Sequence, residues 1–501
     1  MTEPGGESGR ARAELDFLEP TASLDEVLAR RARKHPDAPA LVCGRQTLTR
    51  RQFGELVDAT CLGLQADGLG RGAFVGWLGL NSPAMLAALF ACARLGAVFV
   101  PLNWRLAPAE LAEIAGHAGL SALRFTPEMA PLARQVLDRI QLCGPQAPAH
   151  DGDLMLVYTS GTTGHPKGAM HTQAGMLANA SAALAVQGLH GDDRVLSVLP
   201  LFHVGGLCIQ TLPALLTGAL VLLHERFEPG AWLQDVAAWR PSTSLLVPAV
   251  MKAIIDHPGF PSTDLSALRF LNSGSSVVPV SLIERFHQRG VPVAQVYGST
   301  ETGPVSIALH PDEALPNAGR VGRPAPGVQL RLVDERGVDV ASGEVGEIRL
   351  QARNLMRGYH REPAQAGFVD GWFATGDLAR MLPDGQCEVV GRAKDMIISG
   401  GENIYPAEIE NLVAGWPGVA EAAVVGVPDE RWGEVPVLVL GAAPGATIDL
   451  VALADHFRAR LARFKHPRRI DVLSELPKTA LGKVRKADLV VRLVGSRPPE
   501  A

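Results

Sequence analysis

The segment from Tyr158 to Gly168 combines residue types that can hold a phosphate group. It is rich in glycine, serine and threonine, and it follows the apolar run from Leu154 to Val157, which predicts a strand. A helical pattern comes next, from about His171 to Leu189. Glycines let backbone N–H groups approach an anion, hydroxyls add donors, and Lys167 supplies a positive charge. Since Pro166 precedes this lysine and Gly168 follows it, we predict a strand-to-helix phosphate loop that is not of the Walker type.

A second loop could place a divalent cation beside that phosphate. The apolar segment from Val293 to Gly298 predicts a strand that runs into Ser299, Thr300, Glu301 and Gly303. Mg²⁺ in proteins is usually held by one or two carboxylates together with substrate phosphates. The sequence therefore predicts Glu301 as a metal ligand, with the Thr300 hydroxyl next to it, although a solvated glutamate in a turn remains the competing interpretation.

Several other polar residues could act on a nucleotide or an acid, but each alone fits a turn, a solvated surface or a core. A carboxylate that closes an exposed loop suits the two hydroxyls of a ribose, because it can accept two hydrogen bonds. One glycine-containing loop lies near the start of a short unit that follows residue 391, and another, near the C-terminus, contains a lysine. The residues concerned are Asp377, Arg392, Lys394, Gly400, Gly401, Lys483 and His203.

Together these segments resemble the adenylate-forming superfamily, which comprises acyl-CoA ligases, amino-acid adenylation domains and beetle luciferases. The Tyr158–Gly168 and Val296–Gly303 segments match its two hallmark loops, and the other motifs follow in the family's order between about residues 24 and 490. Ser299 stands where many members carry an apolar residue, a departure that we do not expect to remove the metal function.

The resemblance implies roles that we transfer only through matching motifs. Residues expected to bind the nucleotide or CoA, or to form the hinge, are Thr159, Ser160, Gly161, Thr162, Thr163, Gly164, Lys167, Gly274, Ser275, Tyr297, Gly298, Ser299, Asp377, Arg392, Lys394, Gly400 and Gly401. Those expected to be catalytic are Lys483, His203, Thr300 and Glu301, with Glu301 also the metal ligand. Among them, Asp377 and Arg392 would hold the ribose, and His203 would gate the path of the acid.

The implied reaction joins a carboxylic acid to CoA in two steps. The carboxylate first attacks the α-phosphorus of MgATP, which gives acyl-AMP and pyrophosphate, and the CoA thiolate then attacks the acyl carbonyl. Lys483 would neutralise charge that grows in the first step. Rotation about Lys394 would then replace Lys483 with the Gly400–Gly401 loop.

Three other functions remain open. An amino-acid or aryl-acid adenylating enzyme shares the motifs, but an amino-acid substrate would need an acidic partner, where this chain has Phe202, His203, Val204 and Gly205. A luciferase-like oxygenase also shares them, and oxygen-dependent light emission would decide. A non-catalytic nucleotide-binding protein would be expected to lack Glu301 or Lys483.

Composition limits the partners and the cellular location. The 501 residues are 47% hydrophobic, with a net charge of −5, so nothing favours nucleic acid or an anionic membrane surface as a partner. The cysteines are scattered without a Cys-x-x-Cys pair, and no segment predicts a signal peptide or a membrane span. We therefore expect a cytoplasmic protein without an integral membrane segment, and we leave a homodimer open.

The pattern of elements predicts an α/β fold. Short apolar strands alternate with helices up to about residue 240 and predict parallel sheets, and a small antiparallel β element follows between residues 319 and 352. We expect a flexible tail at 1–20, an N-terminal adenylation domain at 21–393 and a small mobile α+β domain at 394–501.

The sequence does not choose the acid. The segments expected to line its pocket carry apolar residues and glycines but no Lys or Arg, although Lys252 borders one of them. An unpaired buried charge is costly. We therefore expect a fatty or aromatic monocarboxylic acid with a neutral tail, and we interpret Gly205, Gly206 and Gly274 as gaps that leave room for it.

Overall fold

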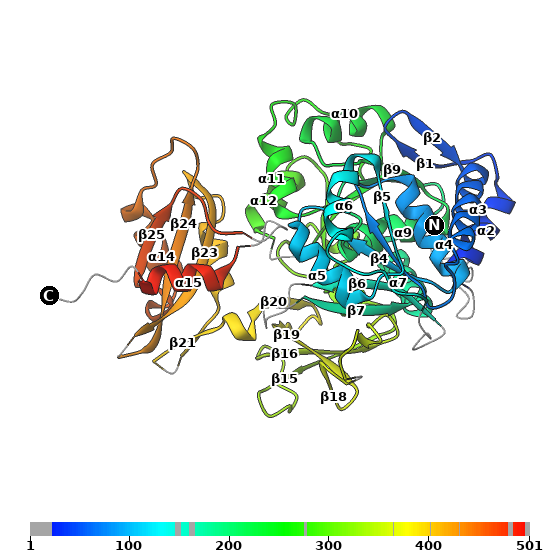
Figure 1. Cartoon of the computed structure of the whole chain (residues 1–501). Coiled ribbons are helices and arrows are strands. Elements are labelled where there is room, and N and C mark those ends of the chain that lie inside the picture. Colours follow the sequence, from blue (N-terminus) through cyan, green and yellow to red (C-terminus); the bar gives the residue numbers. More distant parts are fainter. Residues whose placement is uncertain are drawn as a thin grey trace. The chain divides into compact units, whose positions relative to one another are not determined.

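A computed structural model describes residues 23–145, 152–159, 166–274, 278–363, 365–400, 402–429, 431–478 and 484–495 (Figure 1). The chain divides into two compact units. The first unit comprises Met1–Val278, Arg285–Leu330 and Leu350–Ala374, and the second comprises Pro279–Glu284, Arg331–Arg349 and Thr375–Ala501. The predicted division into a large N-terminal and a smaller C-terminal α/β part is confirmed, while the boundary at residues 393 and 394 stays a prediction.

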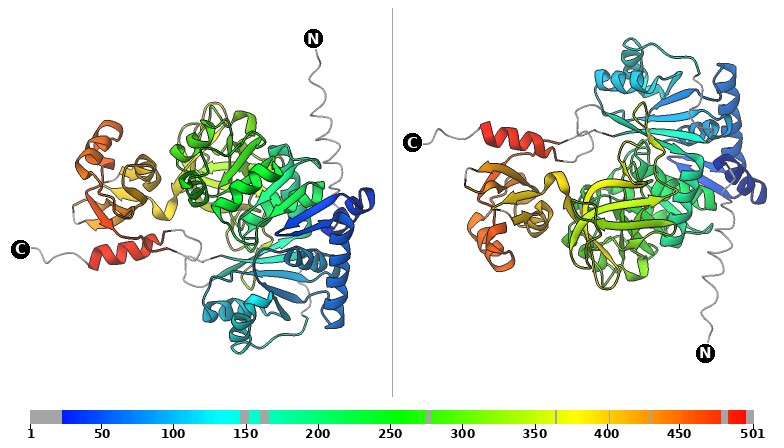
Figure 2. Two further views of the ribbon diagram at one scale, coloured as in Figure 1. Left: turned by 90° about the horizontal axis from the view of Figure 1, so that it is seen from above. Right: turned by 90° about the horizontal axis from the view of Figure 1, so that it is seen from below.

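A nine-stranded sheet forms one half of the first unit. Its order is β14-β13-β12-β11-β10-β8-β9-β1-β2, with parallel pairing from β12 to β1 and antiparallel strands at both edges. The strands are β1 (Pro39–Cys43), β2 (Gln46–Thr49), β8 (Arg194–Ser197), β9 (Leu220–Leu223), β10 (Thr243–Leu246), β11 (Phe270–Gly274), β12 (Val293–Tyr297), β13 (Ile307–Ala308) and β14 (Arg323–Pro324). In Figure 2 the green strands of this sheet and the cyan strands gather in different parts of the unit.

A six-stranded sheet forms the other half, in the order β17-β7-β6-β4-β3-β5. Its strands are β3 (Phe74–Leu78), β4 (Val98–Leu102), β5 (Ala122–Phe125), β6 (Asp153–Thr159), β7 (Lys167–Thr172) and β17 (Gly358–Tyr359). Strands β3 to β6 pair in parallel, whereas β7 runs antiparallel to both β6 and β17. Short, fully buried strands such as β3 and β4 agree with the parallel sheets predicted from the sequence.

The predicted strand-to-helix phosphate loop is wrong in one respect. The loop joins two antiparallel strands, because Thr159 at the end of β6 pairs with Lys167 at the start of β7. Helix α7 (Gln173–Gln187) begins only after β7, where the Thr172 hydroxyl accepts a hydrogen bond from the Gly175 N–H at 3.0 Å and caps the helix. The loop is therefore a hairpin loop, and no helix N-terminus directly follows it.

Helices fill the rest of the first unit. They are α2 (Leu24–Lys34), α3 (Arg50–Ala66), α4 (Pro83–Leu95), α5 (Pro108–Ala118), α6 (Ala130–Leu137), α8 (Val204–Gly206), α9 (Leu212–Thr217), α10 (Pro229–Trp239) and α11 (Pro248–Asp256), with α12 (Val280–His287) contributing to both units. A π-helical turn, η2 (Leu207–Thr211), joins α8 to α9. Helix α4 is buried along nearly its whole length. Within the described part of the chain, every helix is too short or too polar to span a bilayer.

The predicted small antiparallel element is part of a larger sheet. Its order is β15-β16-β19-β18, with β20 paired to β19. The strands are β15 (Val328–Val333), β16 (Val345–Ala352), β18 (Phe368–Val369), β19 (Trp372–Met381) and β20 (Cys387–Arg392). Strands β15, β16 and β19 each contain residues of both units.

The second unit is built on a five-stranded sheet in which β25 extends the order β22-β21-β24-β23 by pairing with β24. Alternation along β23 and β24 gives this sheet two apolar faces: α13 and α14 cover one face and α15 covers the other. The elements are β21 (Ile397–Ser399), β22 (Glu402–Ile404), α13 (Pro406–Val413), β23 (Val419–Asp429), β24 (Gly433–Ala442), α14 (Leu450–Arg460), β25 (Arg469–Leu473) and α15 (Lys486–Gly495).

The interpretation of two glycines as gaps for an acid is also wrong. A Cβ on Gly274 would lie 2.3 Å from the carbonyl oxygen of Val296 on the neighbouring strand, and one on Gly206 would lie 2.3 Å from that of Pro200. Both positions require glycine because the backbone approaches closely, not because they border open space.

Gly274→Ala should therefore destabilise the first unit. We expect a loss of about 1–3 kcal/mol, the usual effect of forcing atoms into a filled space, and a lower midpoint of thermal unfolding. Gly63→Ala on α3 is the control, since a Cβ there meets nothing within 4 Å. If Gly274→Ala unfolded at the same temperature as Gly63→Ala, the close approach of β11 to β12 would be contradicted.

Candidate active site

The base of the phosphate hairpin is held from both sides. Strand β7 pairs with β6 on one side and with β17 on the other, where Tyr359 lies opposite Ala169. The Lys167 ammonium thereby lies 5.2 Å from the centre of the Tyr359 ring, within the range of a cation–π contact. Of the predicted loop, Thr159 and Lys167 are described at these strand ends, whereas Ser160, Gly161, Thr162, Thr163 and Gly164 lie outside the described residues.

The same tyrosine holds Glu301. The Tyr359 hydroxyl donates a hydrogen bond to Glu301 Oε1 at 3.1 Å, and the Met356 N–H donates to the Glu301 carbonyl at 2.7 Å. Burial, together with the nearby Glu301 carboxylate, raises the pKa of Tyr359 well above its ordinary value. The phenol therefore stays protonated at neutral pH and remains a donor. Thus Lys167, Tyr359 and Glu301, from three distant segments of the chain, form one array.

The loop that carries Thr300 and Glu301 is tightly closed. A Cβ on Gly298 would lie 2.2 Å from the Pro304 carbonyl oxygen, and Gly303 has a φ of +71° with the Asn354 carbonyl oxygen 2.1 Å from a would-be Cβ. The Ser299 N–H donates to the Thr302 hydroxyl at 2.8 Å. Both glycines are needed for this geometry, and Ser299 contributes to it through its backbone.

These residues fit the predicted magnesium ion. Glu301 offers a hard carboxylate oxygen, Oε2, that has no hydrogen-bond partner among the described residues, while Oε1 is held by Tyr359. Among the described residues there is no group of three His, Cys, Asp or Glu that could form a complete metal site. A single carboxylate beside a phosphate loop suits Mg²⁺, which keeps several waters and takes substrate phosphate oxygens as ligands.

Histidines pack around the base of the hairpin. The His117 Nδ1 lies 2.7 Å from the Tyr158 hydroxyl, and the His360 ring lies 5.2 Å from Phe74 and 5.7 Å from His117. His171, on β7, is almost fully buried and approaches the backbone of Thr300. Burial lowers the pKa of both His171 and His360 to about 4, with nearby Arg361 adding to the effect at His360. Both are therefore neutral at physiological pH.

His203 begins α8, and its ring lies 4.4 Å from that of Phe202. The segment before it is held by Asn81, whose side chain donates to the Leu199 carbonyl at 2.9 Å and accepts from the Leu201 N–H at 2.8 Å. Two guanidinium groups lie near the Trp104 ring, that of Arg105 at 5.1 Å and that of Arg226 at 5.0 Å from its centre, and Arg105 also lies 5.8 Å from the centre of the Phe202 ring.

The ribose pair predicted in the second unit is in contact. Asp377 on β19 lies opposite Arg392 on β20, and Arg392 Nε is 2.9 Å from Asp377 Oδ1. The prediction that Asp377 ends an exposed loop is wrong, because it lies within a ten-residue strand and is buried. Gly376 has a φ of +69°, and the strand register shifts after Leu378, so the strand contains a bulge there. In the sequence, this bulge has the composition of a turn.

Other predicted residues of the second unit lie on connections. Lys394 is exposed in a short 3₁₀ turn (Ala393–Asp395), and Gly400 turns between β21 and β22 with its N–H bonded to the Trp432 carbonyl at 2.8 Å. The centre of the Trp432 ring lies 5.0 Å from the guanidinium group of Arg431 and 5.5 Å from that of Arg468. Gly401 and Lys483, as well as Ser275 of the first unit, lie outside the described residues.

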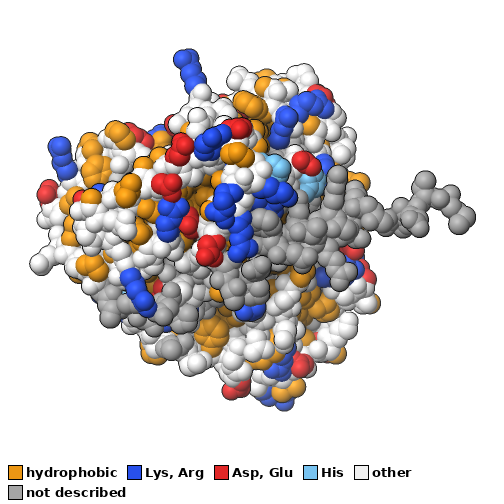
Figure 3. Space-filling model, turned by 90° about the vertical axis from the view of Figure 1, so that its right-hand side faces the viewer, with side chains coloured by type: hydrophobic (Ala, Val, Ile, Leu, Met, Phe, Trp, Pro, Cys, Tyr) orange, Lys and Arg blue, Asp and Glu red, His pale blue; other side chains and the backbone are white. Residues whose placement is uncertain are grey.

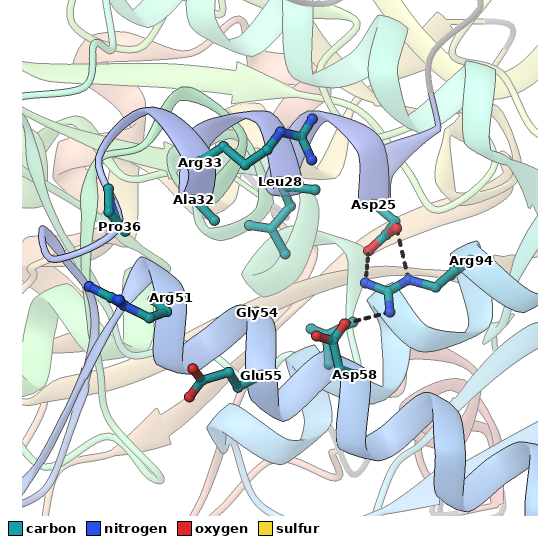
Figure 4. Close-up of a pocket in the computed structure, with 12 residues that line it drawn as sticks. Asp25, Leu28, Ala32, Arg33, Pro36, Arg51, Gly54, Glu55, Asp58 and Arg94 are labelled. Carbon is teal, nitrogen blue, oxygen red and sulfur yellow. Dashed lines mark hydrogen bonds and ion pairs between the residues drawn. The ribbon is translucent and has the colours of Figure 1, made fainter.

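A hollow of about 340 Å³ between α2, α3 and α4 contains none of the predicted site residues. Figure 4 shows Arg94 in it, bonded to both Asp25 and Asp58. On the face drawn in Figure 3, basic and acidic side chains are interspersed. Of the three arginines that line this hollow, Arg94 is paired with Asp25 and Asp58, and Arg51 is paired with Asp37.

Comparison with known proteins places the chain in a family. The sequence model of the AMP-binding enzymes matches residues 28–360, and that of the AMP-binding enzyme C-terminal domain matches 408–483. The indoleacetate–CoA ligase of Aromatoleum aromaticum is 43% identical, over 93% of this chain and 97% of that protein. A feruloyl-CoA synthase of an Amycolatopsis species is 42% identical, over 92% and 97%. The structure of the anthranilate CoA ligase AuaEII with anthranoyl-AMP superimposes with a TM-score of 0.88 at 27% identity, covering 96% of this chain and 100% of that one.

The chain therefore belongs to the AMP-binding enzyme family, in its acyl-CoA ligase branch. It is an ATP-dependent, AMP-forming acid–CoA ligase. Of the functions left open by the sequence, these findings favour this one over an oxygenase or a non-catalytic nucleotide-binding protein.

Tyr359→Phe tests the array around Glu301. It removes the hydroxyl that holds the carboxylate but keeps the ring beside Lys167, so we expect acid-dependent ATP–pyrophosphate exchange to fall about tenfold to a hundredfold, the effect of one lost hydrogen bond to a charged group. The loss should be largest at low Mg²⁺. Tyr158→Phe, which removes a hydroxyl from the same hairpin base, should leave the Mg²⁺ dependence unchanged; equal behaviour of the two variants would contradict the proposed array.

His360→Phe tests the neutral histidines. A histidine whose folded pKa is about 4, compared with about 6.5 when unfolded, contributes stability that is complete above pH 6.5 and is lost as the pH falls toward 4. Phenylalanine fits between the same rings and does not titrate. The decline in unfolding free energy between pH 7 and 4 should therefore be shallower in His360→Phe than in wild type or in the exposed control His35→Gln. An unchanged slope would show that His360 is already charged in the folded protein.

Proposed function

We propose that the acid joined to CoA is an aromatic monocarboxylic acid, in which a short linker separates the ring from the carboxylate. The observation that carries this proposal is the 42–43% identity, over nearly the whole chain, to ligases named for indoleacetate and ferulate. The chemistry of the expected pocket agrees. Its candidate wall residues Phe202, Val204, Leu207, Val305 and Ile307 are apolar and buried.

The charge around this pocket also favours a neutral tail. Lys252, the cation that the sequence places nearest to it, is exposed on α11 and pairs with Asp256 at 2.9 Å. The guanidinium of Arg105 lies 5.8 Å from the centre of the Phe202 ring, and Arg105 is exposed. A second carboxylate buried among the wall residues would therefore lack a cationic partner. Burying an unpaired charge costs roughly several kcal/mol.

In our proposal the first unit positions MgATP. The hairpin loop from Thr159 to Lys167 would hold the β- and γ-phosphates, and Thr300 would contact the α-phosphate. Glu301, held by Tyr359, would bind Mg²⁺, which when bound neutralises charge on the phosphates. His203 would border the path of the acid carboxylate.

In the second unit, Asp377 would accept the hydrogen bonds of the ribose hydroxyls, and Arg392, whose Nε lies 2.9 Å from Oδ1, would orient that carboxylate. Lys483 would neutralise the reacting oxygens, and Lys394 would be the pivot between the two half-reactions. A cytoplasmic location remains a prediction from the sequence, and a homodimer remains open.

For CoA we infer a part for two tryptophans that lie close to arginines, the half-buried Trp104 and the exposed Trp432. An adenine with several phosphates suits a flat indole between guanidinium groups, because the ring can stack and the cations can pair with phosphate. Trp104 with Arg105 and Arg226 in the first unit, and Trp432 with Arg431 and Arg468 beside Gly400 in the second, have this composition.

A panel of acids tests the substrate class. With pyrophosphate release as the measurement, we expect indoleacetate, phenylacetate and ferulate to give higher kcat/KM than hexanoate, and all of these to exceed succinate. Each methylene added to a neutral tail contributes about 0.8 kcal/mol until the pocket is filled. A preference for succinate or malonate over the aromatic acids would overturn the proposal.

Arg226→Gln and Arg468→Gln test the CoA contacts. Each should raise the KM for CoA about fivefold or more, as expected for a charge-assisted bond to phosphate, while pyrophosphate release in the absence of CoA stays at the wild-type rate. Lys252→Gln, which removes an exposed cation with an acidic partner, is the control. An unchanged KM for CoA in both arginine variants would remove the tryptophans from the CoA site.

A further inference from the structure

The π-helical turn η2 depends on side chains from elsewhere. A π-turn interrupts the regular i to i−4 ladder, and such turns concentrate at functional sites. Two of its carbonyls accept side-chain donors from α7: Asn179 Nδ2 donates to Cys208 at 2.8 Å, and Gln187 Nε2 donates to Ile209 at 3.0 Å. Thr211, the last residue of the turn, donates through Oγ1 to the carbonyl of Gly206 in α8 at 2.7 Å. This turn begins at Leu207, shortly after His203, and its shape therefore depends on α7.

Asn179 and Gln187 are closely matched. Both lie on α7, both are buried, with 1% and 2% of their surface exposed, and each donates to one carbonyl of η2. They differ in what the amide oxygen binds. Gln187 Oε1 accepts from Gln210 at 3.2 Å, which is again in η2, so its two bonds stay within one neighbourhood.

The amide of Asn179 instead joins two separate walls. Its Oδ1 accepts from the Val305 N–H at 3.1 Å, a donor that is shared with the Gly303 carbonyl at 2.8 Å. Val305 ends the loop that carries Thr300 and Glu301. Asn354 holds the same loop from its other side, donating to Thr302 at 3.0 Å and to Val305 at 3.3 Å.

We propose that Asn179 is a positioning residue that couples η2, in the wall expected to face the acid, to the loop carrying Thr300 and Glu301. A rigid, fully bonded amide transmits a displacement of the Cys208 carbonyl to the Val305 N–H, because leaving either group unpaired in this buried place is costly. The fit of the acid's tail thereby influences the loop that acts on ATP. This inference rests on the proposed function for the assignment of η2 to the acid and of Glu301 to the metal.

The matched pair Asn179→Leu and Gln187→Met isolates the coupling. Each variant keeps the shape of the side chain and removes the donor from one carbonyl of η2, but only Asn179→Leu also removes the link to Val305. Hydrogen–deuterium exchange of peptides spanning residues 297–307 should become faster, about threefold to tenfold for the loss of one hydrogen bond, in Asn179→Leu and not in Gln187→Met. Asn179→Asp, which keeps an oxygen facing Val305, should exchange like wild type.

Enzyme assays give the second readout. Both variants should raise the KM for the acid, whereas only Asn179→Leu should raise the Mg²⁺ concentration that gives half-maximal ATP–pyrophosphate exchange. If hydrogen–deuterium exchange over residues 297–307 and the Mg²⁺ requirement changed equally in the two variants, or changed in neither, the coupling would be wrong. Glu301→Gln, measured alongside, reports on the proposed function separately: a wild-type Mg²⁺ requirement there would overturn the metal assignment, while the exchange result would still decide the role of Asn179. If Asn179→Leu does not fold, Asn179→Asp takes its place. Hydrogen–deuterium exchange over residues 297–307 that is faster in Asn179→Asp than in Gln187→Met would overturn the coupling. Exchange at the wild-type rate in Asn179→Asp, together with a raised KM for the acid in Gln187→Met alone, would support it.

Discussion

The hydrogen bond from the Tyr359 hydroxyl to Glu301 is the interaction on which the arrangement of the first unit's site depends. Strand β17 is only two residues long, yet it lies against β7 and so brings this phenol to Lys167 and to the Glu301 loop together. Burial keeps the phenol protonated and therefore a donor. One side chain thus fixes the distance between the base of the phosphate loop and the carboxylate expected to bind its metal, and such preorganisation avoids rearrangement during the reaction.

Close backbone approach is the second constraint, and it explains residues that side-chain chemistry does not. Gly298 and Gly303 allow the Glu301 loop to close on Pro304 and Asn354, while Gly274 lets β11 lie against Val296. From the sequence, Gly274 looked like room for a substrate. The structure assigns it to strand packing, because a Cβ there would meet the Val296 carbonyl oxygen.

The sequence predicted what depends on residue type and local period. The parallel sheets of short, buried strands are examples, as in β3 and β4, and resemblance singled out both Asp377 and Arg392, which the structure brings into contact. Pairing between distant segments was not predictable: a two-residue strand such as β17 has no periodicity, so Tyr359 was missed. The hairpin before Lys167 was interpreted as a strand-to-helix loop, and the bulge at Gly376 was interpreted as a turn. Hairpins, bulges, turns and strand-to-helix loops can all be rich in glycine, so composition does not distinguish them. Asn179 was hidden within an apolar helical pattern, since only its partners distinguish it.

The most direct test of the account follows oxygen atoms. Attack of a carboxylate on the α-phosphorus of ATP, followed by thiolysis, transfers one carboxylate oxygen to AMP. With phenylacetate or ferulate labelled with ¹⁸O in both carboxylate oxygens, together with ATP, Mg²⁺ and CoA, mass spectrometry should find one ¹⁸O atom in each AMP and none in pyrophosphate. Label in inorganic phosphate with ADP as the other product, or AMP without label, would contradict an acyl-adenylate formed at the site built around Lys167, Tyr359 and Glu301.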